Sequence, residues 1–572
     1  MQKYVKRLKE RSNFEKNTYL CTSFSKNDLL MYNIRHTGII RTVVIAIAAV
    51  ACHSLYAADG IPKNAGEHCT FEAGLRYSEL VINSRINDFK ANTTASGFGV
   101  FDHNGQMVET PQNSTSVLDY VPGLVAKAIL EAADYYKDSH DVDVAPWYYA
   151  VHRYATTCDI ASNGKQGKSF DDLNAVKLYF KLAEMASSQH FESTDATVTT
   201  ALANQRFASA LAGIAKANNN YVITEQTLAG AAGGWWHKSS YTNQMWCDGQ
   251  YMGPALLAQI INEYDGYEPI TDNDWGLIAK QFTISWQYLW NDEVKLLYHA
   301  FTADPAGSAA SSWAGISAEK GSEVYHSAEY WGRAEAWYFL ALVDVLEQMD
   351  KAERAETQDY QTLRGYLQQL AAGIASKQDA ATGCWYQLLN HDGTFVADSY
   401  SSSYRYTSSP VTNYLESSCT AIFIAAYLKG MRLGLLDTDY TELAKEAYRG
   451  FIQQFMVADG RGGVHLISCC KSAGLGGKNY RDGSAAYYLM GKDTKPTSTS
   501  GSDFYTEGKV LGGFILAATE YERLTETTSV NDTQVRQSAG GDIFSLDGIH
   551  LVDVPQQGFF IRDGKLMVRT QR

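Results

Sequence analysis

A histidine–lysine pair and an aspartate stand close together in an aromatic stretch of the chain. His237 and Lys238 come first, and Asp248 follows ten residues after Lys238, with tryptophan and tyrosine on both sides. Aromatic faces combined with a few convergent charges are how proteins hold sugars and position an acid. The stretch therefore predicts a carbohydrate site in which Asp248 is the acid. The alternative is that Asp248 caps a helix over Gln250–Glu263, a common position for aspartate.

The segments around this stretch are predicted to be helices. Between Val121 and Lys137 apolar residues recur every three or four positions, which is the spacing of one helix face. Successive helices of similar length favour a toroid of helical hairpins. An elongated helical solenoid is the alternative, although the chain shows no fixed sequence period. The same pattern recurs in Phe71–Phe89, Asp172–Ser187, Val198–Ala217, Pro254–Tyr264, Asp274–Trp290, Tyr330–Met349, Gln358–Ser376, Thr412–Leu435, Tyr440–Phe455 and Phe504–Leu524.

Composition narrows the choice of partners. The chain has 572 residues, of which 45% are hydrophobic, enough for a large core, and its formal net charge is -14. Nucleic acid is not an expected partner, because phosphate binding needs a basic patch and the sequence has none. An anionic substrate would be repelled at long range, so local cations would have to overcome that field.

The cysteines do not form a metal-binding pattern. Nine are present, and apart from the adjacent Cys469 and Cys470 they are scattered, with no Cys-x-x-Cys and no His/Cys cluster. We therefore expect no metal and no cofactor. Cys247 stands beside Asp248 and could be a nucleophile. No third group that would orient a Cys–His pair is evident, so we interpret Cys247 as a packing residue.

The N-terminal region resembles an export signal. Two arginines precede a short apolar run at residues 42–51, and a cleavage site can be placed at Ala57. The run is too short to cross a bilayer, so no stable membrane span is expected. Residues 1–57 are thus predicted to be an extension with a signal peptide, and the protein to be periplasmic, secreted or at the cell surface. Lipidation at Cys52 is the alternative to simple cleavage.

The C-terminal region changes character. Residues 542–569 alternate apolar and polar side chains around two Asp-Gly pairs, which predicts short hairpins. We therefore expect a small β-rich tail over residues 528–572. This tail resembles the C-terminal sorting segments of exported bacterial proteins, and a β appendage packed on the main domain is the alternative.

Four ordered blocks together resemble one family of enzymes. They are the stretch that contains HK and QMWCDGQYM, the block WGRAEAW at residues 331–337, GCWYQ at 383–387 and YLESS at 414–418. The blocks are similar to the signatures of the unsaturated glucuronyl and rhamnogalacturonyl hydrolases, glycoside hydrolase family 105 and the related family 88. The resemblance implies an all-α (α/α)6 barrel, which we place at residues 65–527.

The resemblance also implies an unusual reaction. Polysaccharide lyases leave a 4,5-unsaturated uronic acid at the non-reducing end of an oligosaccharide. Enzymes of this family protonate C4 of its enol ether, water adds at C5, and the resulting hemiketal opens and expels the next sugar. One carboxyl group can act first as acid and then as base. The carboxylate separation that distinguishes retaining from inverting glycosidases does not apply to such an exception.

The family pattern assigns roles to the two acids. Asp248 is the expected acid and base, and burial among aromatic neighbours is expected to raise its pKa so that it rests protonated. A second carboxylate, Asp171 by the pattern with Asp172 as the alternative, could raise that pKa further and hold the water. For Asp171 and Asp172 the competing interpretation is a helix N-terminus, where the helix dipole stabilises acids.

The family pattern also suggests groups that bind the substrate. Arg333 is expected to bind the substrate carboxylate through its planar fork, with Lys238 adding charge. The alternative for Arg333 is a wall residue paired with Glu335 or Glu329. His237 and His299 could donate hydrogen bonds to hydroxyls or to the ring oxygen. Three aromatic residues are stacking candidates, with core packing as the alternative for each, namely Tyr120, Trp331 and Trp337.

The sequence leaves the substrate open. Ala334-Glu335-Ala336 stands where the family has Gly-Asn-Gly, which adds bulk and a charge beside Arg333. Rhamnogalacturonan, ulvan and glycosaminoglycans all remain possible sources of the oligosaccharide. Two other functions also remain open. One is another (α/α)6-barrel carbohydrate enzyme, such as an endo-mannanase or a sugar epimerase. The other is a non-catalytic carbohydrate-binding barrel.

Overall fold

The computed structural model describes most of the chain after the predicted leader. The described residues are 60–91, 94–95, 97–112, 118–157, 169–188, 193–316, 323–538, 543–544, 550–551, 558–562 and 565–569. The predicted signal peptide and the alternative lipidation site at Cys52 lie outside them. None of the helices in this part of the chain combines the length and the apolarity that crossing a membrane would require.

Helices form two concentric rings, and outer and inner members alternate along the chain. The outer helices are α5 (Tyr77–Arg85), α7 (Ala145–Thr157), α10 (Ser193–Asn220), α14 (Asp274–Leu289), α16 (Gln358–Ala375) and α18 (Thr441–Phe455). The inner positions are α6 (Tyr120–Tyr136), α8 (Phe170–Asn174) with α9 (Leu178–Ser187), α12 (Cys247–Met252) with α13 (Pro254–Glu263), α15 (Gly332–Lys351), α17 (Ser417–Arg432) and α20 (Gly508–Ser538). The inner ring closes because α20 packs against both α17 and α6. This arrangement is the (α/α)6 barrel that the sequence predicts.

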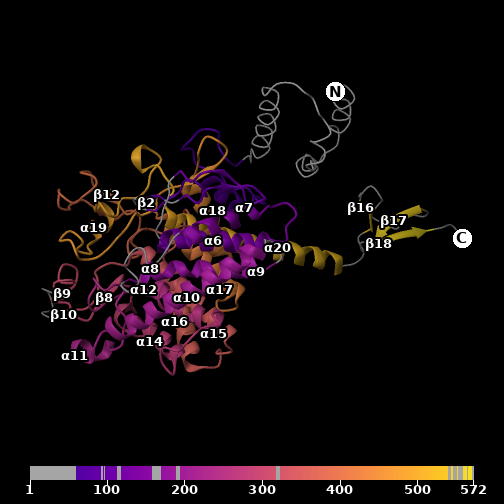
Figure 1. Cartoon of the computed structure of the whole chain (residues 1–572). Coiled ribbons are helices and arrows are strands. Elements are labelled where there is room, and N and C mark those ends of the chain that lie inside the picture. The colour runs from indigo at the N-terminus through magenta and orange to yellow at the C-terminus, as the bar shows by residue number, and fades with distance from the viewer. Residues whose placement is uncertain are drawn as a thin grey trace, which may run out of the picture.

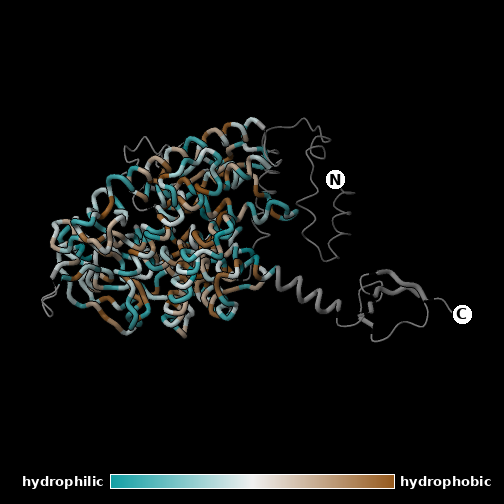
Figure 2. The backbone as a smooth tube through the Cα atoms, turned by 90° about the horizontal axis from the view of Figure 1, so that it is seen from below, coloured by the Kyte–Doolittle hydropathy of each residue, from teal (hydrophilic) through white to brown (hydrophobic). Residues whose placement is uncertain are grey.

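Burial distinguishes the two rings. Every residue of α17 from Ser417 to Leu428 is buried, as expected for a helix that is surrounded on all sides. The outer helix α18 buries mainly one stripe, which includes Ala444, Ala447 and Phe451. Figure 2 shows the same alternation of apolar and polar residues along the helices of the barrel. Small residues let the inner helices approach closely. A Cβ at Gly512 of α20 would lie 2.7 Å from Cγ of Leu124 in α6.

Short antiparallel ladders gather on the side of the barrel where the inner helices begin (Figure 1). With them lie the short helices α11 (Glu225–Leu228) and α19 (Ala485–Met490). The ladders pair β1 (Lys90–Ala91) with β2 (Thr94–Ala95), β3 (Val100–Phe101) with β4 (Met107–Glu109), β5 (Gln244–Trp246) with β8 (Ala300–Thr302), β6 (Trp290–Asn291) with β7 (Leu296–Leu297), β9 (Gly315–Ile316) with β10 (Glu323–Val324), β11 (Val396–Ala397) with β12 (Val411–Thr412) and β13 (Met456–Ala458) with β14 (Val464–Leu466).

The C-terminal tail contains strands, as the alternating pattern predicts. Helix α20 continues to Ser538 and leaves the barrel on the side opposite the ladders (Figure 1). Four short strands follow in the order β16-β15-β17-β18. Their bounds are Ile543–Phe544 for β15, His550–Leu551 for β16, Gly558–Arg562 for β17 and Lys565–Arg569 for β18.

Two features of the helices differ from the sequence analysis. Helix α7 lies at residues 145–157, where no helix is predicted, although Trp147, Val151 and Tyr154 are buried at helical spacing. The predicted helix Asp172–Ser187 is divided into α8 and α9 by one 3₁₀ turn, η2 (Ala175–Lys177). This turn places the Lys177 side chain inside the barrel.

The break between α12 and α13 is stabilised from η2. Pro254 has no backbone N–H, so the helical hydrogen bonding is interrupted there. The carbonyl of Tyr251 instead accepts hydrogen bonds from Nδ2 of Asn174 at 3.0 Å and from Nζ of Lys177 at 2.8 Å. The Lys177 ammonium also lies 3.4 Å from the centre of the Tyr251 ring. Lys177 therefore serves as a buried cap for the broken helix.

A cavity of about 750 Å³ lies among the later turns of the inner helices, away from the ladders. Charged side chains line it, and many of them pair with one another. Nζ of Lys429 lies 2.7 Å from both Oδ1 of Asp344 and Oε2 of Glu347. Burial would raise the pKa of Asp344, but Lys429 outweighs burial and lowers it to about 2. The ion pairs of this cavity therefore couple α15 to α17.

We predict that Lys429→Met destabilises the barrel by about 3–5 kcal/mol near neutral pH, since it removes the cation that two largely buried carboxylates share. Lys351→Met is the matched control. Lys351 contacts Glu347 from a side chain that is 52% exposed, so its loss should cost at most about 1 kcal/mol. Denaturant unfolding of both variants measures the difference.

The cost of Lys429→Met should shrink in acid. The lowered pKa of Asp344 stabilises the parent above the ordinary value of 3.8, and this stabilisation is lost as the pH falls through about 2. Equal stability of the two variants near neutral pH would contradict the coupling of α15 to α17.

Candidate active site

Acidic residues stand where the inner helices begin. Asp119 and Glu416 are N-cap residues whose carboxylates accept hydrogen bonds from backbone N–H groups. Asp171 and Asp248 lie instead within the first turns of α8 and α12 and make no capping bond. Ser169 caps α8, so the carboxylate of Asp171 is not used for that purpose. The capping alternative for Asp248 is therefore not what the structure shows.

Asp248 meets His299 because β5 pairs with β8. Trp246 lies opposite Ala300 in this ladder, and the N–H of Cys247 donates to the carbonyl of His299 at 3.1 Å. Nε2 of His299 then lies 3.4 Å from Oδ2 of Asp248. Neither atom has a hydrogen bond of normal geometry among the described residues. The two side chains form a long, loosely aligned pair at the mouth of the barrel.

The charge state of Asp248 corrects one expectation. Burial would raise its pKa, as the sequence analysis expects, but His299, His237 and Arg333 together outweigh burial. The pKa of Asp248 is therefore below its ordinary value, and in the ligand-free protein the group rests as a carboxylate. The aromatic neighbours remove water, but three positively charged or hydrogen-bonding groups act in the opposite direction.

Asp171 is held by the histidine–lysine pair. Nε2 of His237 lies 2.9 Å from Oδ1 of Asp171, and the Lys238 ammonium forms an ion pair with Oδ2. Burial opposes ionisation, but Lys238 and His237 outweigh it, and the pKa of Asp171 is well below its usual range. Of the two candidate second carboxylates, Asp171 is the one that this pair contacts. It is a permanently ionised group.

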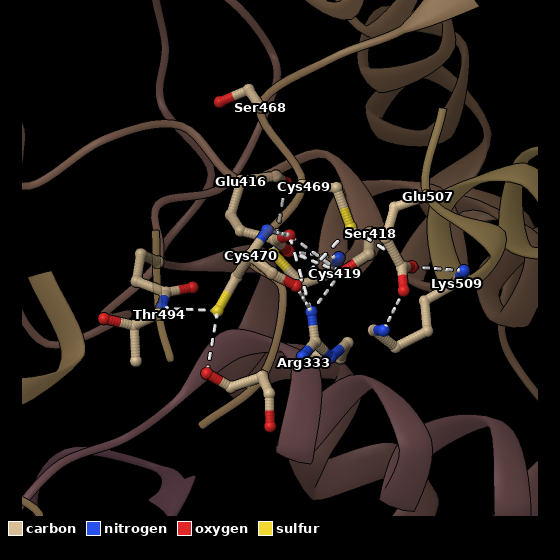
Figure 3. A network of polar contacts seen from close by, with 12 residues as sticks. Arg333, Glu416, Ser418, Cys419, Ser468, Cys469, Cys470, Thr494, Glu507 and Lys509 are labelled. Atoms are coloured by element: carbon tan, nitrogen blue, oxygen red, sulfur yellow. Dashed lines mark hydrogen bonds and ion pairs between the residues drawn. The ribbon is translucent and has the colours of Figure 1, made fainter. Parts of the chain in front are cut away.

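Arg333 is only 2% exposed, and it lies within the network of polar contacts drawn in Figure 3. Its Nη1 donates to the carbonyl of Cys470 and to Oγ of Ser418, and lies 3.8 Å from Oε1 of Glu416. Glu416 is thus its ion-pair partner, and neither Glu335 nor Glu329 is. No hydrogen bond of its Nε or Nη2 is found among the described residues, so that edge keeps donors for a ligand.

Glu416 lies in the YLESS block, and its role becomes evident only in the structure. The carboxylate accepts from N of Cys419 at 2.7 Å, N of Cys470 at 2.8 Å and Oγ of Ser418 at 2.8 Å. Beside this network Glu507 pairs with Lys509 (Figure 3). Of the two adjacent cysteines, Cys470 contributes through its backbone. Its carbonyl accepts from Arg333, and its N–H donates to Glu416.

The aromatic candidates lie at different depths. Tyr120 is half-buried, and its ring meets the edge of Trp337 with 6.5 Å between centroids. Trp337 is 1% exposed and stacks on Tyr251 below the site, so it packs in the core of the barrel. Trp331 lies under the Arg333 guanidinium and donates from Nε1 to Oε1 of Gln387. The positions of Trp331 and Trp337 fit core packing, which is the alternative to stacking on a substrate.

Glu335 is enclosed without a partner. It is fully buried, and neither carboxyl oxygen has a hydrogen bond of normal geometry among the described residues. Burial raises its pKa well above the ordinary value, outweighing the backbone of Leu297 and the Lys377 ammonium. Glu335 therefore carries a proton at neutral pH and adds no charge beside Arg333.

No metal centre is evident in the described part of the chain. No group of three or more His, Cys, Asp or Glu side chains there is arranged to hold a metal ion. The six cysteines in this part, Cys247 among them, are buried free thiols. Burial raises the pKa of Cys247 well above its ordinary value, which favours the packing role.

Comparison with known proteins gives a consistent result. The model of Glycosyl Hydrolase Family 88 matches residues 99–525. Protein Atu3128 of Agrobacterium fabrum and the 24.9 kDa protein in picA locus of Rhizobium radiobacter are each 34% identical over 166 residues, or 28% of this chain. The chain spans 61% of the length of these curated relatives.

A similar structure has been solved for a glycoside hydrolase from family 105 of Clostridium acetobutylicum. It is 25% identical, and the match covers 78% of this chain and all of that one, with a TM-score of 0.53.

We predict that Glu335→Met stabilises the protein increasingly with pH. Above about pH 4.5 the unfolded chain releases the Glu335 proton while the folded chain keeps it. The free energy of unfolding of the parent therefore falls by about 1.4 kcal/mol per pH unit. The variant lacks this loss. Denaturant unfolding from acidic to mildly alkaline pH measures the difference.

Glu416→Met is the matched control, because it removes a buried glutamate that is fully hydrogen-bonded. It should destabilise the protein, because it leaves the N–H groups of Cys419 and Cys470 without their acceptor. A Glu335→Met variant that is less stable than the parent in alkaline buffer would show that this carboxyl is ionised and paired.

Proposed function

The chain belongs to glycosyl hydrolase family 88, and from this membership we propose that it removes a 4,5-unsaturated uronic acid from the non-reducing end of lyase-generated oligosaccharides. The reaction would hydrate the C4=C5 double bond of the enol ether. Asp248 would be its acid and base, and the unsaturated rhamnogalacturonan disaccharide is one candidate substrate.

The observation that carries this proposal is the different use of the two carboxylates. Direct displacement at a glycosidic bond needs two carboxyl groups that share the proton and nucleophile work. Both oxygens of Asp171 are engaged, Oδ1 by His237 and Oδ2 by Lys238, so Asp171 is poorly suited to attack a sugar carbon or to exchange a proton. Asp248 is half-buried at the mouth of the barrel, and its Oδ2 makes only a long contact with His299. One exchangeable carboxyl group suffices for hydration.

The steps follow from the chemistry of an enol ether. Asp248 gives its proton to C4, and the positive charge that develops at C5 is shared with the ring oxygen. Water then adds at C5 while the Asp248 carboxylate takes one of its protons, which restores the acid. The hemiketal opens to a keto sugar and expels the next residue of the oligosaccharide.

Local cations would bind an acidic sugar to an acidic protein. The free edge of Arg333 offers N–H donors for a planar carboxylate. Lys238 lies across the site beside Asp171 and adds positive potential. His237 lies beside Lys238 and is held against Asp171 by its Nε2, so its part in binding would be to fix that carboxylate.

Substrate binding would raise the pKa of Asp248, and Asp248 would then take up from solvent the proton that it lacks at rest. A uronate carboxylate bound near Asp248 adds a like charge, and this raises the pKa of the enzyme acid. Binding and proton uptake are thus coupled. We further propose that the protein acts after export, which rests on the leader-like residues 1–57.

We predict that the purified protein removes the ultraviolet absorbance of unsaturated disaccharides, and that Asp248→Asn lowers this rate about a hundred- to ten-thousand-fold. Lyase digests of rhamnogalacturonan, ulvan and glycosaminoglycans form the panel. Asp292→Asn is the control, because Asp292 is an exposed carboxylate away from the site. Near-parental activity of folded Asp248→Asn would end the assignment.

We also predict that kcat/KM and kcat lose activity at different pH values. kcat/KM reports the free enzyme, so it should fall as the pH rises above the lowered pKa of Asp248, while kcat should persist to higher pH. KM should therefore rise about tenfold per pH unit between the two limits. Steady-state kinetics on one disaccharide measures both profiles. If kcat and kcat/KM fell at the same alkaline pH, this would contradict proton uptake on substrate binding.

A further inference from the structure

Tyr488 reaches the candidate acid through His299. It lies on α19, between β14 and α20, and is fully buried. Its Oη is 2.6 Å from Nδ1 of His299, although 189 residues separate the two in the chain. His299 is also fully buried, and its other nitrogen faces Asp248. The three side chains form a line from the tyrosine hydroxyl to the carboxylate.

The direction of the hydrogen bonds in this line can be assigned. Burial lowers the pKa of His299, although Asp248 opposes this, so the ring is neutral and has a single N–H. If that N–H were on Nδ1, the Nε2 lone pair would face the Asp248 carboxylate and the tyrosine O–H would lack a partner among the described residues. If Tyr488 donates to Nδ1, the tyrosine O–H has its acceptor and Nε2–H faces Oδ2 of Asp248 at 3.4 Å.

The backbone of Tyr488 is held by the network around Arg333. Nε2 of Gln387 donates to the carbonyl of Tyr488 at 3.1 Å, and Oε1 of Gln387 accepts from Nε1 of Trp331 at 3.0 Å. Trp331 in turn lies under the Arg333 guanidinium. The tyrosine is thus anchored to the same wall that presents the cation.

We propose that Tyr488 is a positioning residue for the reaction of Asp248: its hydroxyl fixes the tautomer of His299 so that Nε2–H faces the carboxylate. This inference rests on the proposed function of Asp248. His299 keeps the anionic form of Asp248 in place until substrate binds, and then supports its return to a carboxylate after proton donation. Tyr488 does not touch the reacting atoms.

Removal of the hydroxyl has a defined consequence. In Tyr488→Phe the ring of His299 can present the Nε2 lone pair, which favours a protonated Asp248. The other charged or titratable groups that act on His299 are His237 and Arg333, and both stay in place. The alkaline limb of kcat/KM should therefore move to higher pH, while kcat falls about ten- to a hundred-fold because the acid is less well oriented.

Tyr487→Phe is the matched control for this variant. Tyr487 is the preceding residue of α19, equally buried, and its hydroxyl donates to the carbonyl of Gly474 at 2.6 Å. Loss of that bond should lower the melting temperature without moving the pH profile. If Tyr488→Phe keeps the kcat and pH profile of the parent, or if Tyr487→Phe shifts the profile equally, the inference is overturned.

NMR of the histidine ring nitrogens in the parent protein provides a test that needs neither substrate nor a folded variant. The expected result is that His299 carries its proton on Nε2, and a proton on Nδ1 would overturn the inference. This result does not depend on activity. Failure to consume any unsaturated substrate would instead refute the proposed function, while an active enzyme with an unchanged Tyr488→Phe profile would refute only the role of Tyr488.

Discussion

Burying the positive charge of Arg333 imposes the strongest constraint on this end of the barrel. A guanidinium cut off from water must have acceptors at fixed positions, or its desolvation would destabilise the fold. Glu416 supplies the charge, and the carbonyl of Cys470 supplies a directed acceptor (Figure 3). Because Glu416 also caps α17, the same carboxylate fixes a helix end, a loop and the cation. The mouth of the barrel is therefore a preformed wall with one edge of Arg333 left for a ligand.

Two aspartates with the same intrinsic chemistry acquire different roles from their neighbours. Asp171 contacts a lysine and a histidine directly, and their combined effect holds it ionised. Asp248 has only a long contact with a neutral histidine, so an additional nearby charge can change its protonation. Coulomb interactions of this kind become stronger where water is excluded. Neighbouring charges can therefore shift the pKa of an acid strongly at this site in the mouth of the barrel.

The interior of the barrel connects this site to its opposite end. Below Tyr120, Trp337 stacks on Tyr251 with 4.8 Å between ring centroids, and Lys177 lies on the far face of this stack. Lys177 also caps the break at Pro254, which sets where α12 ends and thus how its first turn presents Asp248. Beyond it, paired charges such as those of Lys429 line the cavity among the later turns of the inner helices. Rigid packing from end to end keeps the site in one geometry.

The sequence by itself determined the elements and the main chemical groups. Helical periodicity located most of the helices, since an apolar stripe every three or four residues is a local property. The ordered blocks pointed to Asp248, Arg333 and His237, and the wider family pattern to Asp171 and His299. Three of the four blocks lie within a few residues of the start of an inner helix. Helix α7 was not predicted, and α12 did not continue through Pro254.

Only the tertiary structure decided which of these groups act on one another. Spacing in the sequence does not reveal that β8 brings His299 to Asp248, that Glu416 pairs with Arg333, or that Tyr488 lies behind His299. The expectation of a raised pKa for Asp248 was wrong for this reason. Burial can be inferred from aromatic neighbours in the chain, but the opposing hydrogen bond and charges come from distant segments. Electrostatic effects depend on distances in space, and those are set when the ring of helices closes.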